Sequence, residues 1–115
     1  MYSNLTSDDI LLKDELDALQ RKHPERFEIM YNLTREKPKS LTWTNVSQFK
    51  KEHVERFVFA NRPPSNKHLV MVCGPPKFME SISGEPFMVN GKKEQGPLKG
   101  LLKDVGMKEE NVFKF

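Results

Sequence analysis

The sequence predicts an α/β protein in which helices pack on a parallel sheet. Leu69–Cys73 is an uninterrupted apolar run, which is typical of a parallel strand that is buried on both faces. Gly74-Pro75-Pro76 follows at once; it ends the strand and lets a helix begin near Phe78. Strand-like and helix-like segments alternate along the 115 residues, and this order favours a parallel sheet. The length corresponds to one domain or a part of one.

The first third of the chain predicts a strand, a helix and a second strand. Thr6 or Ser7, followed by two aspartates, is a favourable helix start because a capping oxygen and acidic side chains suit the positive end of the helix dipole. Pro24 ends that helix. The expected strands are Met1–Asn4 and Phe27–Leu33, and the expected apolar helix face is Leu12, Leu16 and Leu19.

The rest of the chain predicts two further strands, separated by helices and loops. Residues 83–97 contain three glycines and two prolines, which indicates an exposed loop with a small hairpin at Asn90-Gly91. Gly106 is expected to close the last helix. The other expected elements are a polar loop over Glu36–Thr44, an amphipathic helix over Val46–Phe59, a helix over Leu98–Val105 and a strand over Val112–Phe115.

Composition excludes several classes of site. The chain has one cysteine, so it forms no internal disulfide, and this suits a reducing, cytoplasmic compartment. Its three histidines lack the spacing of metal ligands, and no apolar run is long enough to span a membrane. The net charge of +3 includes a lysine excess near the end, but no aromatic residues interleave with it to suggest nucleic-acid binding. From composition alone, we expect the lysines to form a solvated face.

Cys73 lies where the apolar strand gives way to a helix. Open α/β sheets bind their ligands at this edge, so the thiol is a candidate site residue. The alternative is a small buried cysteine followed by a turn.

Cys-Gly-Pro-Pro-x-Phe-Met at residues 73–79, together with an aromatic last residue, resembles the closing segment of the NADH–cytochrome b5 reductase family. That family is part of the ferredoxin–NADP reductase group. Residues 2–12 resemble its second strand and the following turn, and residues 27–35 resemble its third strand. Residues 100–106 and 111–115 resemble its last helix and last strand, with a fungal character. The resemblance covers nearly the whole chain in the family's order.

The resemblance implies binding of NAD(P)H, and of FAD only in an intact homologue. Cys73 would position the nicotinamide as a catalytic residue, with Gly74 and Pro75 shaping the floor beneath it. Phe115 resembles a residue that lies near the flavin, although packing of a last strand is an equal alternative. The cofactor-binding residues that the family resemblance implies are Thr34, Arg35, Cys73, Gly74, Pro75, Pro76, Phe78, Met79 and Phe115.

Thr34 departs from the family pattern. The NADH-using members carry an acidic residue here that binds the adenosine ribose and repels a 2′-phosphate. Thr34-Arg35-Glu36 instead resembles the Ser-Arg-Glu of NADP-using relatives, so we expect relaxed or NADPH-leaning preference. The alternative is a threonine that only ends a strand. The segment Trp43–Asn45 lacks the glycines expected near this side of the nucleotide.

Two family features have no counterpart in this sequence: the FAD-binding barrel, and the first strand with its glycine-rich phosphate loop. The first glycine is Gly74. We therefore expect residues 1–115 to form a partial, Rossmann-like NAD(P)H-binding domain, a doubly wound parallel sheet without its first, central strand. Such a chain should not act as a reductase alone.

The expected partners are a pyridine nucleotide, an acidic haem protein similar to cytochrome b5, and a full-length reductase. The expected location is the cytoplasm, or the surface of the endoplasmic reticulum or mitochondrial outer membrane beside an anchored reductase. The alternatives are an interaction module that associates through exposed sheet edges, or a vestigial product.

Overall fold

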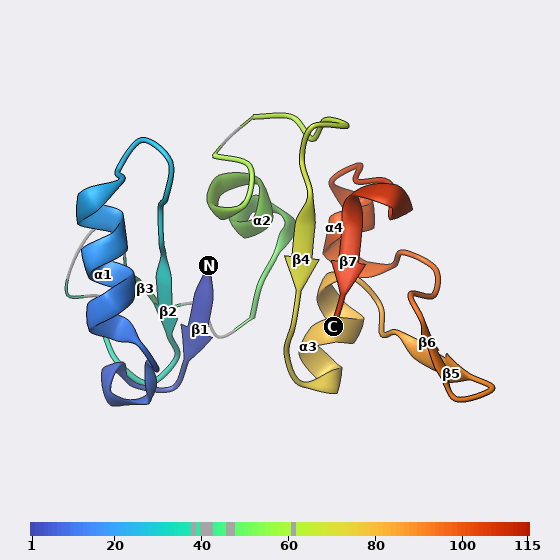
Figure 1. Ribbon diagram of the computed structural model, residues 1–115, viewed down its shortest axis with the longest axis horizontal. Coiled ribbons are helices and arrows are strands. Elements are labelled where there is room, and N and C mark those ends of the chain that lie inside the picture. The colour runs from blue at the N-terminus through green and yellow to red at the C-terminus, as the bar shows by residue number, and fades with distance from the viewer. Residues whose placement is uncertain (38, 40–42, 46–47, 61) are drawn as a thin grey trace. The chain divides into compact units, whose positions relative to one another are not determined.

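The computed structural model describes residues 1–37, 39, 43–45, 48–60 and 62–115 (Figure 1). The chain divides into two compact units, Met1–Gln48 and Phe49–Phe115, and each is built around a parallel sheet. The two parallel sheets share no strand among the described residues, as expected for a doubly wound sheet that lacks its central strand. The α/β class is confirmed.

The Met1–Gln48 unit is a three-stranded parallel sheet with a helix. The sheet has the order β1-β2-β3, and its register places Ser3 beside Asn32 and Asn32 beside Thr44. Its elements are β1 (Tyr2–Asn4), a short 3-10 helix η1 (Ser7–Asp9), α1 (Lys13–Lys22), β2 (Tyr31–Leu33) and β3 (Trp43–Thr44).

A polar ladder crosses this sheet at its centre. Asn32 is fully buried; its Nδ2 donates to Ser3 Oγ over 2.8 Å, and its Oδ1 accepts from Thr44 Oγ1 over 3.0 Å. Each strand therefore contributes one side chain to the chain of hydrogen bonds, which satisfies a polar group that would be costly to bury alone. Thr44 belongs to a strand where the sequence predicted only a loop, and that prediction is wrong at β3. Residues 38 and 40–42 of the predicted loop lie outside the described residues.

The helix α1 packs through only one of the three leucines that the sequence predicted for its apolar face. Leu12 is 67% exposed and has a left-handed φ of 56°, so the chain breaks there between η1 and α1; Leu19 is 41% exposed. Instead, the side chains of Leu16, Asp17 and Gln20 meet the sheet unit. Asp17 accepts a hydrogen bond from Tyr31 over 2.8 Å, and Gln20 accepts one from the Ile29 N–H over 2.8 Å. The prediction of a single helix is therefore wrong, and the predicted apolar face is confirmed at Leu16 but wrong at Leu12 and Leu19.

The strand predicted over Phe27–Leu33 is shorter than expected, because only Tyr31–Leu33 pairs. Ile29 is still buried, and Phe27 packs against the same cluster. The core of this unit consists of Ile10, Ile29, Tyr31 and Leu33.

The Phe49–Phe115 unit has a parallel pair of strands, a hairpin and three helices. Met71 of β4 pairs with Phe113 of β7, and Met88 of β5 pairs with Lys93 of β6. The elements are α2 (Lys51–Phe57), β4 (Val70–Val72), α3 (Pro76–Ile82), β5 (Phe87–Val89), β6 (Lys92–Glu94), α4 (Gly100–Asp104), a 3-10 helix η2 (Glu109–Asn111) and β7 (Val112–Lys114). Figure 1 shows α3 and α4 behind the β4–β7 pair and the hairpin projecting from the unit.

The β4–β7 pair is buried on one face only. Val72 and Val112 point into a core that α2, α3 and α4 complete. On the other face Leu69 is 63% exposed, Met71 64% and Phe113 45%. The expectation of a strand buried on both faces is therefore wrong for this chain, because the described helices of this unit pack on the same side of the pair.

The hairpin predicted at Asn90-Gly91 is confirmed. Asn90 and Gly91 have φ of 50° and 77°. A two-residue hairpin turn of type I′ requires positive φ at both of its central residues. The predicted exposed loop 83–97 is a hairpin with exposed strands, although it begins at the buried residues Ser83 and Gly84. The helix predicted from Val46 begins at Lys51; residues 46 and 47 lie outside the described part of the chain.

Candidate functional site

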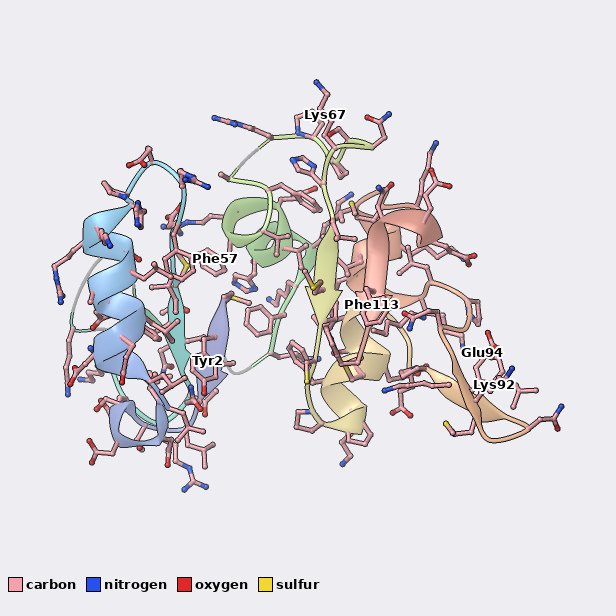
Figure 2. The ribbon with its side chains drawn as sticks, in the orientation of Figure 1. Tyr2, Phe57, Lys67, Lys92, Glu94 and Phe113 are labelled. Carbon is pink, nitrogen blue, oxygen red and sulfur yellow. The ribbon has the colours of Figure 1, made fainter. Side chains whose placement is uncertain are left out.

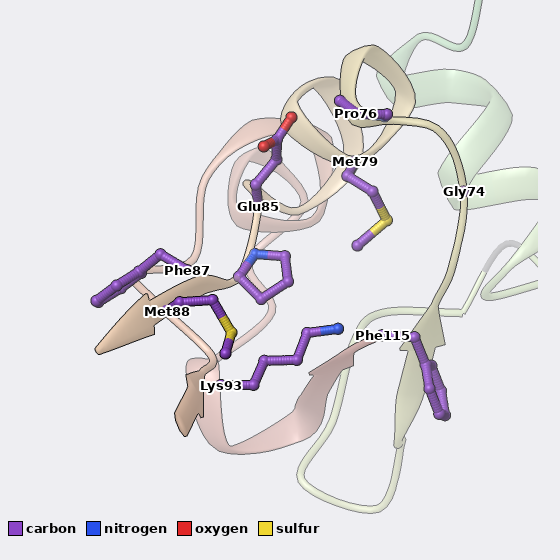
Figure 3. A pocket seen from close by; sticks show the side chains of 9 residues that line it. Gly74, Pro76, Met79, Glu85, Phe87, Met88, Lys93 and Phe115 are labelled. Atoms are coloured by element: carbon purple, nitrogen blue, oxygen red, sulfur yellow. The ribbon is translucent and has the colours of Figure 1, made fainter. Parts of the chain in front are cut away.

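A cavity of about 270 Å³ opens between the carboxyl end of β4 and the β5–β6 hairpin (Figure 3). All of its lining belongs to the Phe49–Phe115 unit. The lining residues are Gly74, Pro76, Met79, Glu85, Pro86, Phe87, Met88, Lys93 and Phe115. Most of these side chains are apolar, and two are charged, which is the usual make-up of a small-molecule site.

The first wall of the cavity follows directly from the local sequence. β4 ends at Val72, and Pro75 in extended conformation precedes α3, whose first residue is Pro76. Proline is favourable at this position because its missing N–H would have no partner in the first turn. The Phe115 N–H donates to the Val72 carbonyl over 2.9 Å, so the last residue of the chain is held beside the end of β4.

Gly74 leaves bare backbone at this wall. A Cβ atom built on Gly74 would lie 2.5 Å from the Phe78 ring, closer than real Cβ contacts, so a side chain here would displace that ring. Phe78 in turn packs against the core cluster beneath. The absence of a side chain at 74 therefore leaves room for the Phe78 ring beside the backbone of this wall.

The second wall of the cavity is the β5–β6 hairpin, and Lys114 forms hydrogen bonds with the segment that follows it. The buried Lys114 ammonium donates to the carbonyls of Gly96 and Pro97 over 3.1 and 3.0 Å. The Gln95 side chain accepts from the Lys114 N–H over 2.7 Å and donates to its carbonyl over 3.1 Å. Burial lowers the pKa of Lys114. These four hydrogen bonds fix the segment that follows β6 against β7.

The two charged lining residues lie at different ends of the cavity. Figure 3 shows the Lys93 side chain extending toward Phe115, and the Glu85 carboxylate near Pro76 and α3. Among the described residues, the Lys93 ammonium has neither a hydrogen-bond acceptor nor an ion-pair partner. It is therefore available to a ligand.

The structure brings together four of the residues singled out in the sequence: Gly74, Pro76, Met79 and Phe115. Cys73 is exposed beside them without lining the cavity, Pro75 caps α3, and Phe78 packs toward the core. Sequence reasoning missed the hairpin residues and Glu85 and Pro86 at its base. The Asn90-Gly91 turn signal indicated a hairpin but gave no sign of which face would meet the cavity.

Thr34 and Arg35 lie in the other unit, directly after β2. The Thr34 N–H donates to the Asn4 carbonyl over 3.1 Å, and the Arg35 N–H donates to the Leu5 carbonyl over 2.9 Å. Both residues therefore lie at the carboxyl edge of the β1–β2 pair, and the Arg35 side chain is exposed. Glu36 accepts hydrogen bonds from the Ser7 N–H over 2.6 Å and from its hydroxyl over 2.9 Å, and the Ser7 N–H is the main reason that its pKa is lowered.

The lining is largely apolar, with Glu85 and Lys93 as its charged side chains. In the parts of the chain that the structure describes, no three His, Cys, Asp or Glu residues are grouped to hold a metal ion. None of the described helices is long and apolar enough to cross a membrane.

Comparison with known proteins gives consistent matches. Residues 1–84 match the family model described as oxidoreductase NAD-binding domain. An NADH-cytochrome b5 reductase 2 from Candida glabrata is 41% identical over 116 residues, covering 99% of this chain and 36% of the relative. A protein of the same name from Chaetomium globosum is 40% identical, covering 100% of this chain and 31% of the relative.

A solved structure shows the same fold. The cytochrome b5 reductase domain of Ulva prolifera nitrate reductase superposes with a TM-score of 0.68 at 24% identity, covering 99% of this chain and 35% of that chain. This chain spans about a third of the length of the curated relatives that it matches.

Proposed function

This chain belongs to the oxidoreductase NAD-binding domain family, and we propose that it is the C-terminal, NAD(P)H-binding part of a cytochrome b5 reductase-like flavoprotein. The cavity between Gly74 and the hairpin would hold the nicotinamide ring. The observation that carries this proposal is that Gly74, Pro76, Met79 and Phe115 surround one cavity at the carboxyl end of a parallel strand.

This chain's contribution would be to orient the nicotinamide. Gly74 would form part of the wall beside the ring, and Phe115 and Met79 would give the ring apolar contact. Cys73, which is exposed and precedes the lining residue Gly74, would fix the position of the reactive carbon as the catalytic residue. In an intact homologue, FAD accepts the hydride; it is bound by a part of that protein that this sequence does not resemble.

The adenosine end would lie at the carboxyl edge of the β1–β2 pair. Thr34 and Arg35 offer a hydroxyl and a guanidinium there, a combination that suits a 2′-phosphate. Glu36 is two residues after Thr34, and its carboxylate accepts a hydrogen bond from the Ser7 N–H. We therefore infer that the site accepts NADPH at least as readily as NADH.

The electron acceptor would be an acidic haem protein similar to cytochrome b5. The Phe49–Phe115 unit holds twelve Lys and Arg against eight Asp and Glu, whereas the Met1–Gln48 unit holds seven against eight. The positive charge is thus concentrated on the unit that carries the cavity, which favours steering of an acidic partner to it. The location of this chain would be the cytoplasm, or the surface of a membrane to which a reductase is anchored.

A second candidate function is association with a full-length reductase as an interaction module. The exposed apolar face of the β4–β7 pair favours it, because large exposed apolar patches commonly mark protein contacts. A vestigial product would show neither nucleotide binding nor such association.

Nucleotide titration of the isotope-labelled chain, followed by NMR, tests the proposed function. We expect NADH and NADPH to shift the amide signals of residues 74–79, 85–88 and 115. Phe115→Ala should weaken binding about three- to tenfold, the usual contribution of an aromatic contact, while Phe113→Ala should leave it unchanged because Phe113 does not line the cavity. Without the flavin part, the chain should pass no electrons from either nucleotide to ferricyanide. Turnover with stoichiometric bound FAD, or shifts confined to other residues, would contradict the proposal.

A further inference from the structure

We propose that Lys93 makes the cavity selective for the reduced, neutral nicotinamide over its oxidised, cationic form. This inference rests on the proposed function, since it assigns a specificity-determining residue to the same cavity. It goes further in assigning the discrimination between the two redox states of the ligand to one hairpin lysine.

The hairpin geometry directs Lys93 into the cavity and its neighbour away from it. Lys93 pairs with Met88, and both side chains line the cavity, whereas Lys92 pairs with Val89 on the opposite face of the hairpin. Successive residues of a strand point to opposite faces, so two adjacent lysines have different surroundings. Figure 3 shows the Lys93 side chain reaching toward Phe115, and Figure 2 shows Lys92 and Glu94 at the outer part of the hairpin.

The charges around the cavity favour a neutral ring near Lys93. The Lys93 ammonium has no acidic partner among the described residues, so its charge acts on whatever occupies the cavity. Two further cations lie close to the hairpin base: Lys114 is buried and donates to two carbonyls, and Lys99 pairs with Glu80. The only acidic side chain of the lining, Glu85, directs its carboxylate toward Pro76 and α3, away from Lys93 (Figure 3).

The ligand changes its charge during the reaction. A dihydronicotinamide ring is neutral, and when it gives up a hydride to the flavin, two electrons and one proton leave together and the ring becomes a cation. The walls formed by Pro76, Met79 and Phe115 are apolar, which lessens the screening of a nearby charge. The ammonium therefore repels the oxidised ring and leaves the reduced ring unaffected, so the cavity favours the substrate and releases the product.

The affinity ratio for the two redox forms of nicotinamide mononucleotide tests this inference on the whole chain. Because the two forms have nearly the same shape, loss of structure would weaken both, whereas loss of the Lys93 charge would change their ratio. By NMR titration we expect the chain to bind the reduced form on the order of three- to tenfold more tightly than the oxidised form.

Matched variants isolate the charge. Lys93→Gln should bring the ratio close to one, and Lys92→Gln should leave it unchanged, since Lys92 lies on the other face of the same strand pair. Glu85→Gln should raise the ratio, because it removes a negative charge of the lining that would attract the oxidised ring. Added salt should lower the ratio in the unmodified chain but not in the Lys93→Gln chain.

The outcomes separate this inference from the proposed function. If both forms bind and Lys93→Gln changes the ratio no more than Lys92→Gln, the inference is wrong and the proposed function stands. If neither form binds while 5′-AMP still shifts signals of residues 34–36, the placement of the nicotinamide in this cavity is wrong, and the inference falls with it.

Discussion

Thr34 is the residue that most directly sets which nucleotide the proposed site would accept. It follows β2 at the carboxyl edge of the sheet, and its backbone N–H is held by the Asn4 carbonyl, so its position is fixed by strand pairing. A hydroxyl there neither repels a phosphate nor binds two ribose hydroxyls as a carboxylate would.

Thr34→Asp should reverse the preference between the two adenosine halves. We expect the unmodified chain to bind 2′,5′-ADP at least as tightly as 5′-AMP. The aspartate should shift the ratio toward 5′-AMP by about 1–3 kcal/mol, because one charge-assisted contact is exchanged for a repulsion. Calorimetric titration with both nucleotides measures the ratio. Equal ratios before and after the change would show that position 34 does not contact the ribose, and Thr44→Ser, on the neighbouring strand, serves as the conservative control.

Tyr31 ties the stability of its unit to alkaline pH. The residue is 1% exposed, and burial, together with the hydrogen bond to Asp17, raises the pKa of its hydroxyl above the ordinary value near 10. In the unfolded chain this tyrosine ionises near pH 10, whereas in the folded chain it stays neutral. Its contribution to stability is therefore complete below pH 10 and is lost progressively as the pH rises above that value.

Tyr31→Phe should remove this pH dependence. Urea unfolding of the unmodified chain, followed by the fluorescence of the single tryptophan, should shift to lower urea between pH 8 and pH 11. The Tyr31→Phe chain should be less stable at pH 8, because Asp17 loses a donor, and should show a smaller shift over the same interval. Identical shifts in the two chains would show that other groups account for the loss.

At the scale of elements, the polar ladder across β1, β2 and β3 sets the register of the Met1–Gln48 sheet. A slip of one residue would turn Asn32 to the other face and separate it from Ser3 and Thr44. Three strands of two or three residues have few backbone hydrogen bonds, so the ladder supplies a large share of what holds them in one alignment.

Asn32→Leu should destabilise this unit by about 1–3 kcal/mol. The leucine is close in size but leaves Ser3 and Thr44 without their buried partner. Asn66→Leu, at an exposed position of the other unit, is the control and should change little. Urea unfolding measured by tryptophan fluorescence gives both values. Equal stability of the Asn32→Leu chain would show that the ladder contributes nothing net.

Elements with strong local signals were predictable from the sequence, and those whose packing face depends on the rest of the fold were not. Asn90-Gly91 alone fixes the hairpin, because two positive φ angles need such residues. The leucines of α1 predicted its packing face only at Leu16, since the other contacts that orient the helix are made by Asp17 and Gln20 with Tyr31 and Ile29. These polar contacts join residues nine and fourteen positions apart and leave no periodic apolar pattern.

The candidate site was half predictable for the same reason. Gly74, Pro76 and Met79 are close in sequence and belong to a recognisable motif. Lys93 and Phe87 reach the cavity only because the hairpin folds back and the segment after it is hydrogen-bonded to Lys114. Exposure of Met71 was missed because an apolar run predicts burial on both faces whether or not the chain supplies a cover for each.

At the scale of the whole molecule, the most consequential surface is the uncovered face of the β4–β7 pair. Leu69, Met71, Phe113 and Phe115 are each 45–64% exposed, and the Phe113 and Phe115 rings contact each other edge to face at 4.9 Å. Both strands are also edge strands of a two-stranded sheet, so unpaired backbone groups lie beside apolar side chains. Such a surface promotes association of chains in water.

We therefore expect the purified chain to self-associate with rising concentration, and Met71→Lys to reduce this. Sedimentation velocity from about 5 to 200 µM should show a concentration-dependent increase in mean mass for the unmodified chain. Met71→Lys places a charge at the centre of the face, and since Met71 is 64% exposed, the change should leave the fold intact. Leu19→Lys adds the same charge on α1, at a residue that is 41% exposed, and should leave association unchanged, which separates a local effect from a general rise in net charge. A strictly monomeric chain at 200 µM, or equal suppression by both lysines, would show that this face is not the one through which the chains associate.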